Sequence, residues 1–313
     1  MRLRLVVAGC AALLAAIPAS GQQPHDAEFH FANTTPAYTA GQGPRVCMDT
    51  AHNNFQSAER NPAAYRPFER LLADDGYRVG EFAQKFTAEA LAECDLLVIA
   101  DATGEANLGD WAFPHPSAFT RGELEALYLW IRAGGALLVI SDHMPTPAAA
   151  SDLGAMLGVI PTDGYARLGP GPTPDVFSRA AGHLRDHAIL RGRSEKEQVH
   201  VVASWTGHAF HLSREWSPIV RFGPESFAWI HLGFNFPELP REQWPVFPIP
   251  GWAHAAARRL DKGRVVWLGE VSICTALRLG EERRPVGMNH PAATQNAQFC
   301  ISTVRWLSGL LGD

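Results

Sequence analysis

The chain has 313 residues and a mass of 34.1 kDa, which is long for one small domain and short for three. Hydrophobic residues make up 46% of it, and this fraction excludes an intrinsically disordered chain. The formal net charge of −5 offers no basic surplus to neutralise a phosphate backbone, so we expect no nucleic-acid partner. No internal apolar run is long enough to predict a transmembrane segment.

Residues 1–21 have the pattern of a secretory signal peptide. Two arginines precede an apolar stretch from Leu5 to Ile17, and small residues follow up to Gly21. We therefore expect a periplasmic or secreted protein. Residues 7–10 also resemble a lipobox, so the alternative is a lipoprotein anchored through Cys10.

Four cysteines follow this segment, and their surroundings favour buried thiols over disulfides. An even number in an oxidising compartment permits disulfides. However, free cysteine commonly packs as a small hydrophobe, and two of the four lie in apolar, strand-like or helix-like patterns. No CxxC spacing indicates a thiolate zinc site. The four are Cys47, Cys94, Cys274 and Cys300.

Beyond a polar, irregular stretch at residues 22–43, which predicts an exposed leader, apolar runs alternate with amphipathic ones. We expect residues 44–313 to form a single domain. Thr120 and Glu123 have the spacing of a helix capping box. Strands are predicted at 45–48, 77–82, 95–101, 136–140 and 264–268, and helices at 61–75, 87–93, 120–133 and 292–311.

Buried apolar strands joined by helices predict an α/β fold, with a mainly parallel sheet covered by helices on both faces. The region of about 160–260 is rich in proline and tryptophan and predicts a partly β elaboration of the same domain. Within it, residues 218–222 and 227–232 are expected to form a hairpin around Gly223. Its tryptophans could stack on a sugar, but packing in the core or in a lid is favoured.

Polar residues follow the carboxyl ends of the predicted strands, where open parallel sheets bind ligands. Carboxylates and imidazoles gathered at one edge can act as acids and bases, or hold a divalent metal. The alternative is that Asp49 and Asp142 only bind loop amides. Asp101 is also expected at this edge. The candidate catalytic residues are Asp49, His52, Asp142, His143 and Glu270, and the candidate substrate-binding residues are Asn53 and Asn289.

Other motifs contribute little. The sequence has no GxGxxG or Walker pattern, so no nucleotide cofactor is expected. HExxH and GxSxG are also absent. His183 and His187 are four residues apart, as in a helical metal pair, but Gly182 indicates a turn there instead.

The runs RVCMDTAHNNF, YRPFERLLADDGYRV and GELEALYLWIRAGGALLVISDHMP, with the tail VGMNHPAATQNAQFCISTVRWLSGLL, resemble the class I glutamine amidotransferase-like superfamily. The resemblance is strongest to an uncharacterised bacterial group related to trehalose-utilisation-type proteins. It covers about residues 45–311 and implies a flavodoxin-like fold without an agreed activity. Amidotransferases of this superfamily carry a nucleophilic cysteine on a strand-to-helix turn. Here that turn reads Ser141-Asp142-His143, so we expect no cysteine-dependent glutaminase.

Three functions stay open at this point. The first is an exported hydrolase or lyase that acts on a small polar or carbohydrate-like substrate at the sheet edge. The second is a non-catalytic module that binds a glycan or an envelope partner through the same crevice. The third is a degenerate domain that serves as a scaffold. The sequence leaves the metal, the substrate and the oligomeric state undetermined.

Overall fold

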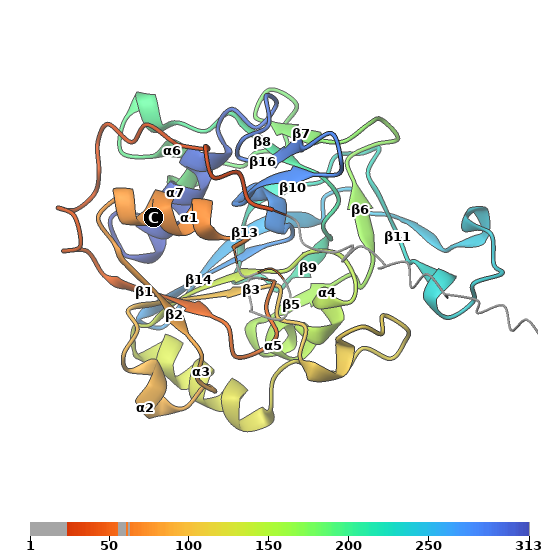
Figure 1. Ribbon diagram of the computed structural model, residues 1–313, viewed down its shortest axis with the longest axis horizontal. Helices are drawn as coiled ribbons and strands as arrows, with labels where there is room; N and C mark the ends of the chain where they lie inside the picture. Colours follow the sequence, from red (N-terminus) through yellow and green to blue (C-terminus); the bar gives the residue numbers. More distant parts are fainter. Residues whose placement is uncertain (1–23, 56–60, 62, 313) are drawn as a thin grey trace, which may run out of the picture.

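The computed structural model describes residues 24–55, 61 and 63–312, so the predicted signal peptide and Cys10 lie outside the described residues. A central sheet runs through the molecule, with helices above and below it (Figure 1). Five neighbouring strands are parallel, in the order β2-β1-β3-β4-β14. Numbered among themselves, they have the 2-1-3-4-5 order of the flavodoxin-like fold, which confirms the predicted fold class. The strands are β1 (Arg45–Asp49), β2 (Arg78–Phe82), β3 (Leu96–Ala100), β4 (Ala136–Ile140) and β14 (Gly263–Leu268).

Antiparallel strands extend this sheet beyond β14. The long strand β13 forms a hairpin with β14 and also pairs with β10 and β9, and β9 pairs in turn with β5. These strands come from the Pro/Trp-rich region, so that region adds strands to the central sheet. They are β5 (Val159–Pro161), β9 (Phe210–Leu212), β10 (Ser217–Arg221) and β13 (Ala253–Leu260).

The sheet is buried on both faces, because successive side chains of a strand point to opposite sides. In β3, Leu96 and Val98 belong to one core and Leu97 and Ile99 to the other. The first core contains side chains of α1 (Arg66–Asp74), α6 (Ala188–Arg191) and α7 (Asn296–Leu307). The second contains side chains of α2 (Ala88–Leu91), α3 (Arg121–Ala133) and α5 (Ser151–Leu157), which α4 (Thr146–Ala149) precedes.

Local capping signals predicted two helix starts correctly. The side chain of Thr87 accepts a hydrogen bond from the backbone N–H of Ala90, and Thr120 and Glu123 form the expected capping box. The other two helices are shorter than predicted, since α1 begins at Arg66 and α7 spans Asn296–Leu307.

Short strands of the described residues form three smaller sheets, two of them within the elaboration and the third, β15-β16, after it. The predicted hairpin of residues 218–222 and 227–232 is wrong, because the two strands belong to different sheets. Strand β10 pairs with β13, which buries Ile219 and Val220 in the core. The small sheets are β12-β11-β6, β7-β8 and β15-β16. Their strands are β6 (Tyr165–Arg167), β7 (Asp175–Ser178), β8 (Val201–Ser204), β11 (Phe227–Trp229), β12 (Val246–Pro248), β15 (Ala276–Leu279) and β16 (Arg284–Gly287).

Single 3-10 turns complete the described secondary structure. They are η1 (Glu105–Asn107), η2 (Glu195–Glu197), η3 (Leu232–Phe234), η4 (Arg241–Gln243) and η5 (Val271–Ile273). No helix within residues 24–55, 61 and 63–312 combines the length and hydropathy required to cross a membrane.

All four described cysteines form disulfides, so the expectation of four buried thiols is wrong. Cys47 of β1 is bonded to Cys94, and Cys274 after η5 is bonded to Cys300 of α7. All four are buried, so burial alone could not distinguish a thiol from a disulfide. In both pairs the Cα atoms lie 5.8 Å apart, a separation that the sequence does not reveal.

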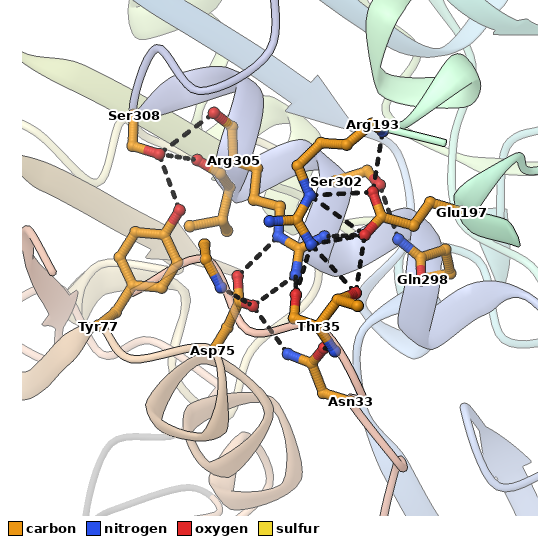
Figure 2. Close-up of polar contacts among 12 residues, drawn as sticks. Asn33, Thr35, Asp75, Tyr77, Arg193, Glu197, Gln298, Ser302, Arg305 and Ser308 are labelled. Atoms are coloured by element: carbon orange, nitrogen blue, oxygen red, sulfur yellow. Dashed lines mark hydrogen bonds and ion pairs between the residues drawn. The ribbon is translucent and has the colours of Figure 1, made fainter. Parts of the chain in front are cut away.

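A buried ion-pair network holds the leader against the domain (Figure 2). Arg305 of α7 is 1% exposed and binds Asp75 at 2.5 Å and Glu197 at 2.9 Å. The described leader residues join this network, since Arg305 donates to the carbonyl of Thr35 at 3.0 Å and Asn33 donates to Asp75 at 2.7 Å. Most residues of the leader are exposed, but these hydrogen bonds to the buried side chains of Asp75 and Arg305 hold it in place.

Candidate active site

A pocket lies at the carboxyl ends of the parallel strands. Three acidic residues line it, each following the end of a different strand: Asp101 after β3, Asp142 after β4 and Glu270 after β14. His143 lines the same pocket. The volume of about 200 Å³ exceeds that of a roughly 150 Å³ cavity that admits benzene, so the pocket has the volume for a small molecule.

The backbone after β3 and β4 positions two of these carboxyl groups. Asp101 has a φ of 57°, in the left-handed region that a non-glycine residue rarely occupies. Its Oδ1 accepts a 2.8 Å hydrogen bond from the backbone N–H of Asp142, which also lies 3.0 Å from Thr146 Oγ1. Thr146 Oγ1 donates in turn to the carbonyl of His143. Side-chain oxygens of Asp101 and Thr146 therefore hold the turn after β4, and Asp142 in this turn lines the pocket.

The environment of Asp142 favours its protonated form. Its Oδ1 is buried and has no hydrogen-bond partner among the described residues. Burial, together with the charges of Glu270 and Asp101, raises the pKa of Asp142 well above its ordinary value, although N–H groups of His143 and Gly207 act in the opposite direction. Among the described residues that line the pocket, none is a lysine or an arginine. Asp142 is therefore suited to give a proton to a bound molecule.

Glu270 is held as a hydrogen-bond acceptor. Its Oε2 accepts from the backbone N–H groups of Thr206 at 2.7 Å and Trp205 at 3.2 Å, and its Oε1 accepts from the N–H of Ser272 at 3.1 Å. This close approach of the loop requires glycine at position 207, where a Cβ atom would lie 2.1 Å from the carbonyl oxygen of Gly269 and 2.9 Å from the Cβ of Glu270. The carboxylate is thus fixed in position beside a carboxyl group that favours holding its proton.

An aromatic stack fixes His143 at the rim. Its Nδ1 donates to the carbonyl of Met144 at 2.8 Å, since a carbonyl oxygen can only accept. The ring lies 4.2 Å from that of Tyr165, which lies 5.2 Å from that of Trp229. The guanidinium of Arg241 lies 5.6 Å from the Trp229 ring. Because the rings cover one another, this part of the tryptophan-rich region supports the pocket wall.

Asp49 and His52 lie outside this pocket, contrary to the expectation that all strand-end residues gather there. The two oxygens of Asp49 lie 2.9 and 3.0 Å from His52 Nδ1, and His52 Nε2 lies 2.9 Å from Glu123. The imidazole packs between Phe86 and Phe119. The reason is the alternation along β1, which places Asp49 on the same face as Cys47 and therefore toward α2 and α3.

The Asp49–His52–Glu123 network is a buried charge cluster. Burial alone opposes a charge on His52, but the hydrogen bonds and charges of Asp49 and Glu123 outweigh it and raise the pKa of His52. Glu123 behaves in the opposite sense: burial would raise its pKa, but Thr120 and His52 lower it to about 2. This cluster connects β1 to the start of α3, and its groups do not line the pocket.

The two asparagines also lie away from the pocket. Asn53 is half-buried in the turn after β1, with a φ of 50°. Asn289 donates to Asp26 of the leader at 2.9 Å and to the carbonyl of Leu277 at 3.0 Å. Neither residue lines the pocket, so the expectation that they orient a substrate there is not met.

The histidine pair is not a metal pair in the structure. The Nδ1 atoms of His183 and His187 accept from the backbone N–H groups of Ser178 and Ile189, and His187 caps α6. Over the described part of the chain, no group of three or more His, Cys, Asp or Glu residues has an arrangement that could hold a metal ion.

Two features of the site escaped the sequence. Tyr65 is fully buried, and its hydroxyl has no hydrogen-bond partner among residues 24–55, 61 and 63–312. Burial and the charges of the three pocket carboxylates raise the pKa of Tyr65 well above its ordinary value. Behind Glu270, Ser204 Oγ lies 2.8 Å from His254 Nε2 and 3.4 Å from Glu270 Oε2. In the sequence, Tyr65 stood out only as an apolar position of a predicted helix. No motif indicated that Ser204 or His254 would lie near the site.

Comparisons with known proteins concern the fold. No family model and no curated protein matches the chain. A solved structure described as the "mmIFT52 N-terminal domain" aligns with a TM-score of 0.58 at 12% identity, over 84% of this chain and 97% of that one. The likeness is one of fold. A ThuA-like protein from Bacteroides uniformis aligns with a TM-score of 0.49 at 14% identity, over 87% and 95% of the two chains. A Thermoplasma acidophilum protein described as part of a GMP synthase aligns with a TM-score of 0.41 at 9% identity, over 84% of this chain and 96% of that one.

Proposed function

We propose that the chain is an exported acid–base enzyme, a hydrolase or lyase, that acts on a small polar or carbohydrate-like substrate in the pocket of Asp101, Asp142 and Glu270. The observation that carries this proposal is the pair of Asp142 and Glu270. The surroundings of Asp142 raise the pKa of its carboxyl group, whereas backbone N–H groups hold the side chain of Glu270 as a hydrogen-bond acceptor. Two carboxyl groups with different environments in one pocket suit the roles of acid and base.

In the hydrolytic form of the reaction, Asp142 gives its proton to the leaving-group oxygen as the bond to that oxygen breaks. Glu270 removes a proton from water, whose oxygen forms the new bond. The products together contain the substrate and one water, and the two carboxyl groups exchange their proton through solvent before the next cycle. In the lyase form, Glu270 would instead remove a proton from carbon while Asp142 protonates the leaving group.

Export is part of the proposal and is supported by two observations. Residues 1–21, outside the described part of the chain, have the pattern of a signal peptide. The two disulfides suit an oxidising compartment. The disulfides also leave no thiol among the described cysteines to act as a nucleophile, which agrees with the absence of a cysteine at Ser141-Asp142-His143. We further propose that the chain belongs with the trehalose-utilisation-type group that its sequence resembles.

A panel of p-nitrophenyl glycosides and esters tests the enzymatic proposal through release of nitrophenolate. We expect at least one member to be hydrolysed, and Asp142→Asn and Glu270→Gln each to reduce kcat roughly 10²–10⁴-fold. Asp261→Asn removes an exposed carboxylate outside the pocket and serves as the matched control, with an unchanged rate. Equal rates in the wild type and both pocket variants would contradict the proposal. Glycan binding without turnover that survives Asp142→Asn would favour the non-catalytic module.

A further inference from the structure

We propose that the leader forms one wall of the pocket indirectly: residues 24–26 add a strand to the β15-β16 hairpin, and Asp26 is a positioning residue that fixes this hairpin against the pocket. The inference rests on the proposed function only in assigning the pocket to the substrate. The leader would then set the shape of a site formed by residues far away in the chain.

The hairpin needs support from outside. It forms a two-stranded sheet that is not part of the central sheet, and two strands alone give little stability. The start of β15 packs in the first core, but β16 is exposed or half-buried up to Val286. Leu279 of β15 and Val286 of β16 nevertheless line the pocket, together with Asp142 and Glu270 at the strand ends. A movement of this hairpin therefore changes the space available to a substrate.

The leader supplies the missing third strand through its backbone. The N–H of Asp26 donates to the carbonyl of Ala276 at 2.7 Å, and the N–H of Arg278 donates to the carbonyl of Pro24 at 2.8 Å. Between these bonds, His25 and Leu277 form an antiparallel bridge. This pairing covers the edge of β15, which would otherwise present unpaired backbone groups.

The side chain of Asp26 then connects both strands of the hairpin. Its Oδ2 lies 2.9 Å from a guanidinium nitrogen of Arg278, within β15, and accepts a 2.9 Å hydrogen bond from Asn289, just beyond β16. Asp26 is buried. Burial alone would raise its pKa, but Asn289 and Arg278 lower it, so the carboxylate keeps its charge. Neutralising this one carboxylate therefore weakens contacts to both strands of the hairpin at the wall of the pocket.

The other charged groups near this leader strand do not replace Asp26. Glu28 is exposed, and only its backbone N–H contacts Asp26, at 3.3 Å. Arg70 of α1 donates to the carbonyl of Ala27 at 3.2 Å, which fixes the leader to the helix and not to the hairpin. Glu28→Gln is therefore a matched control, because it removes the same charge from the same segment without touching the hairpin.

Hydrogen exchange of the full mature chain, followed by mass spectrometry, tests the leader strand without a substrate. In Asp26→Asn we expect peptides that cover residues 276–287 to exchange at least tenfold faster. Peptides that cover β3 and β4 should not change, and Glu28→Gln should match the wild type. Arg278→Gln should reproduce the Asp26→Asn result. Unchanged exchange at 276–287 in Asp26→Asn, or equal acceleration across the whole domain, would overturn the proposal.

Kinetics with a hydrolysed p-nitrophenyl substrate separate the leader strand from the proposed function. Because Asp26 positions a wall and does not touch the reacting atoms, we expect Asp26→Asn to raise KM more than it lowers kcat. If exchange becomes faster only at residues 276–287 but no substrate is hydrolysed, the proposed enzymatic function is rejected and the role of the leader strand is supported. If turnover requires Asp142 but exchange at residues 276–287 is unchanged in Asp26→Asn, the role of the leader strand is rejected and the enzymatic function is supported.

Discussion

The backbone N–H of Asp142 donates a 2.8 Å hydrogen bond to Oδ1 of Asp101. This bond connects the ends of two adjacent parallel strands, β3 and β4, and occupies the Asp101 oxygen on that side. Asp142 itself lines the pocket, and burial, together with the charges of Glu270 and Asp101, raises the pKa of its carboxyl group. The surroundings of the strand ends thus favour a proton on Asp142.

Asp142→Asn should increase stability at neutral pH while it reduces turnover. The pKa of Asp142 is raised in the folded protein, so between pH 3.8 and that raised value the native state binds more protons than the unfolded state. Stability of the wild type therefore falls as the pH rises through this interval, whereas the amide variant lacks this loss. Urea unfolding at pH 4 and pH 8 should give similar stabilities at pH 4 and a more stable variant at pH 8. A variant that is less stable at pH 8 would indicate a structural role for Asp142.

His52→Gln should destabilise the fold without removing activity from the folded fraction. Removing the imidazole leaves Asp49 and Glu123 facing one another in the core, and breaking such a buried cluster costs about 3–5 kcal/mol. Because the pKa of His52 is raised, its contribution is complete below pH 6.5 and is lost as the pH rises through the folded-state value. Unfolding measured at pH 5.5 and pH 8.5 should show the larger loss at pH 5.5. Normal stability with loss of turnover would return His52 to the catalytic machinery.

Arg305→Met should be among the most destabilising substitutions outside the pocket. The side chain joins two buried carboxylates and the leader (Figure 2), and we expect a loss of about 3–5 kcal/mol in the free energy of unfolding. Arg132→Met breaks an exposed pair with Asp261 and should cost less than about 1 kcal/mol. Chemical unfolding of both variants gives the comparison. Similar small losses in both would show that the network contributes little.

The same network should make the fold sensitive to acid. Burial alone would raise the pKa of Glu197, but Arg193 and Arg305 lower it to about 2. Its contribution to stability is therefore present above pH 4.5 and is lost as the pH falls toward 2. In Glu197→Gln, the dependence of the melting temperature on pH between 4.5 and 2 should be weaker than in the wild type. An unchanged dependence would contradict the ionic role of Glu197.

Removal of either disulfide should destabilise the chain strongly. The cross-links span 47 and 26 residues, and the chain-entropy relation gives about 4 and about 3.5 kcal/mol for loops of these lengths. Cys47→Ala/Cys94→Ala and Cys274→Ala/Cys300→Ala test the two separately by urea unfolding. Thiol titration of the denatured wild type, produced without residues 1–21, should detect no free thiol. Four free thiols would instead support the expectation from the sequence that the four cysteines are buried thiols.

The sequence predicted the architecture because that information is local. Apolar runs at 95–101, 136–140 and 264–268 marked three buried strands, and the pair Thr120 and Glu123 marked a helix start. It predicted only part of the site, because the face to which a strand-end residue points depends on the register of the whole sheet. Asp49 ends β1 and Asp142 follows β4, yet only Asp142 lines the pocket.

The remaining parts of the site depend on contacts between distant segments. Ser204 meets Glu270 across 66 residues, and Asn289 meets Asp26 across 263 residues. No spacing rule in the sequence relates such pairs. The disulfides were missed for the same reason, since Cys47 and Cys94 are brought together only when the strand–helix unit between them has folded.

A carbon-13 NMR titration of the Asp142 side-chain carboxyl group, assigned by comparison with Asp142→Asn, tests the central claim without any substrate. We predict a titration midpoint well above pH 3.8 in the wild type, and a lower midpoint in Glu270→Gln, which removes the neighbouring charge. Asp261→Asn should leave the midpoint unchanged. A midpoint near that of a free aspartic acid, or one that does not respond to Glu270→Gln, would contradict the pairing of these two carboxyl groups in one pocket.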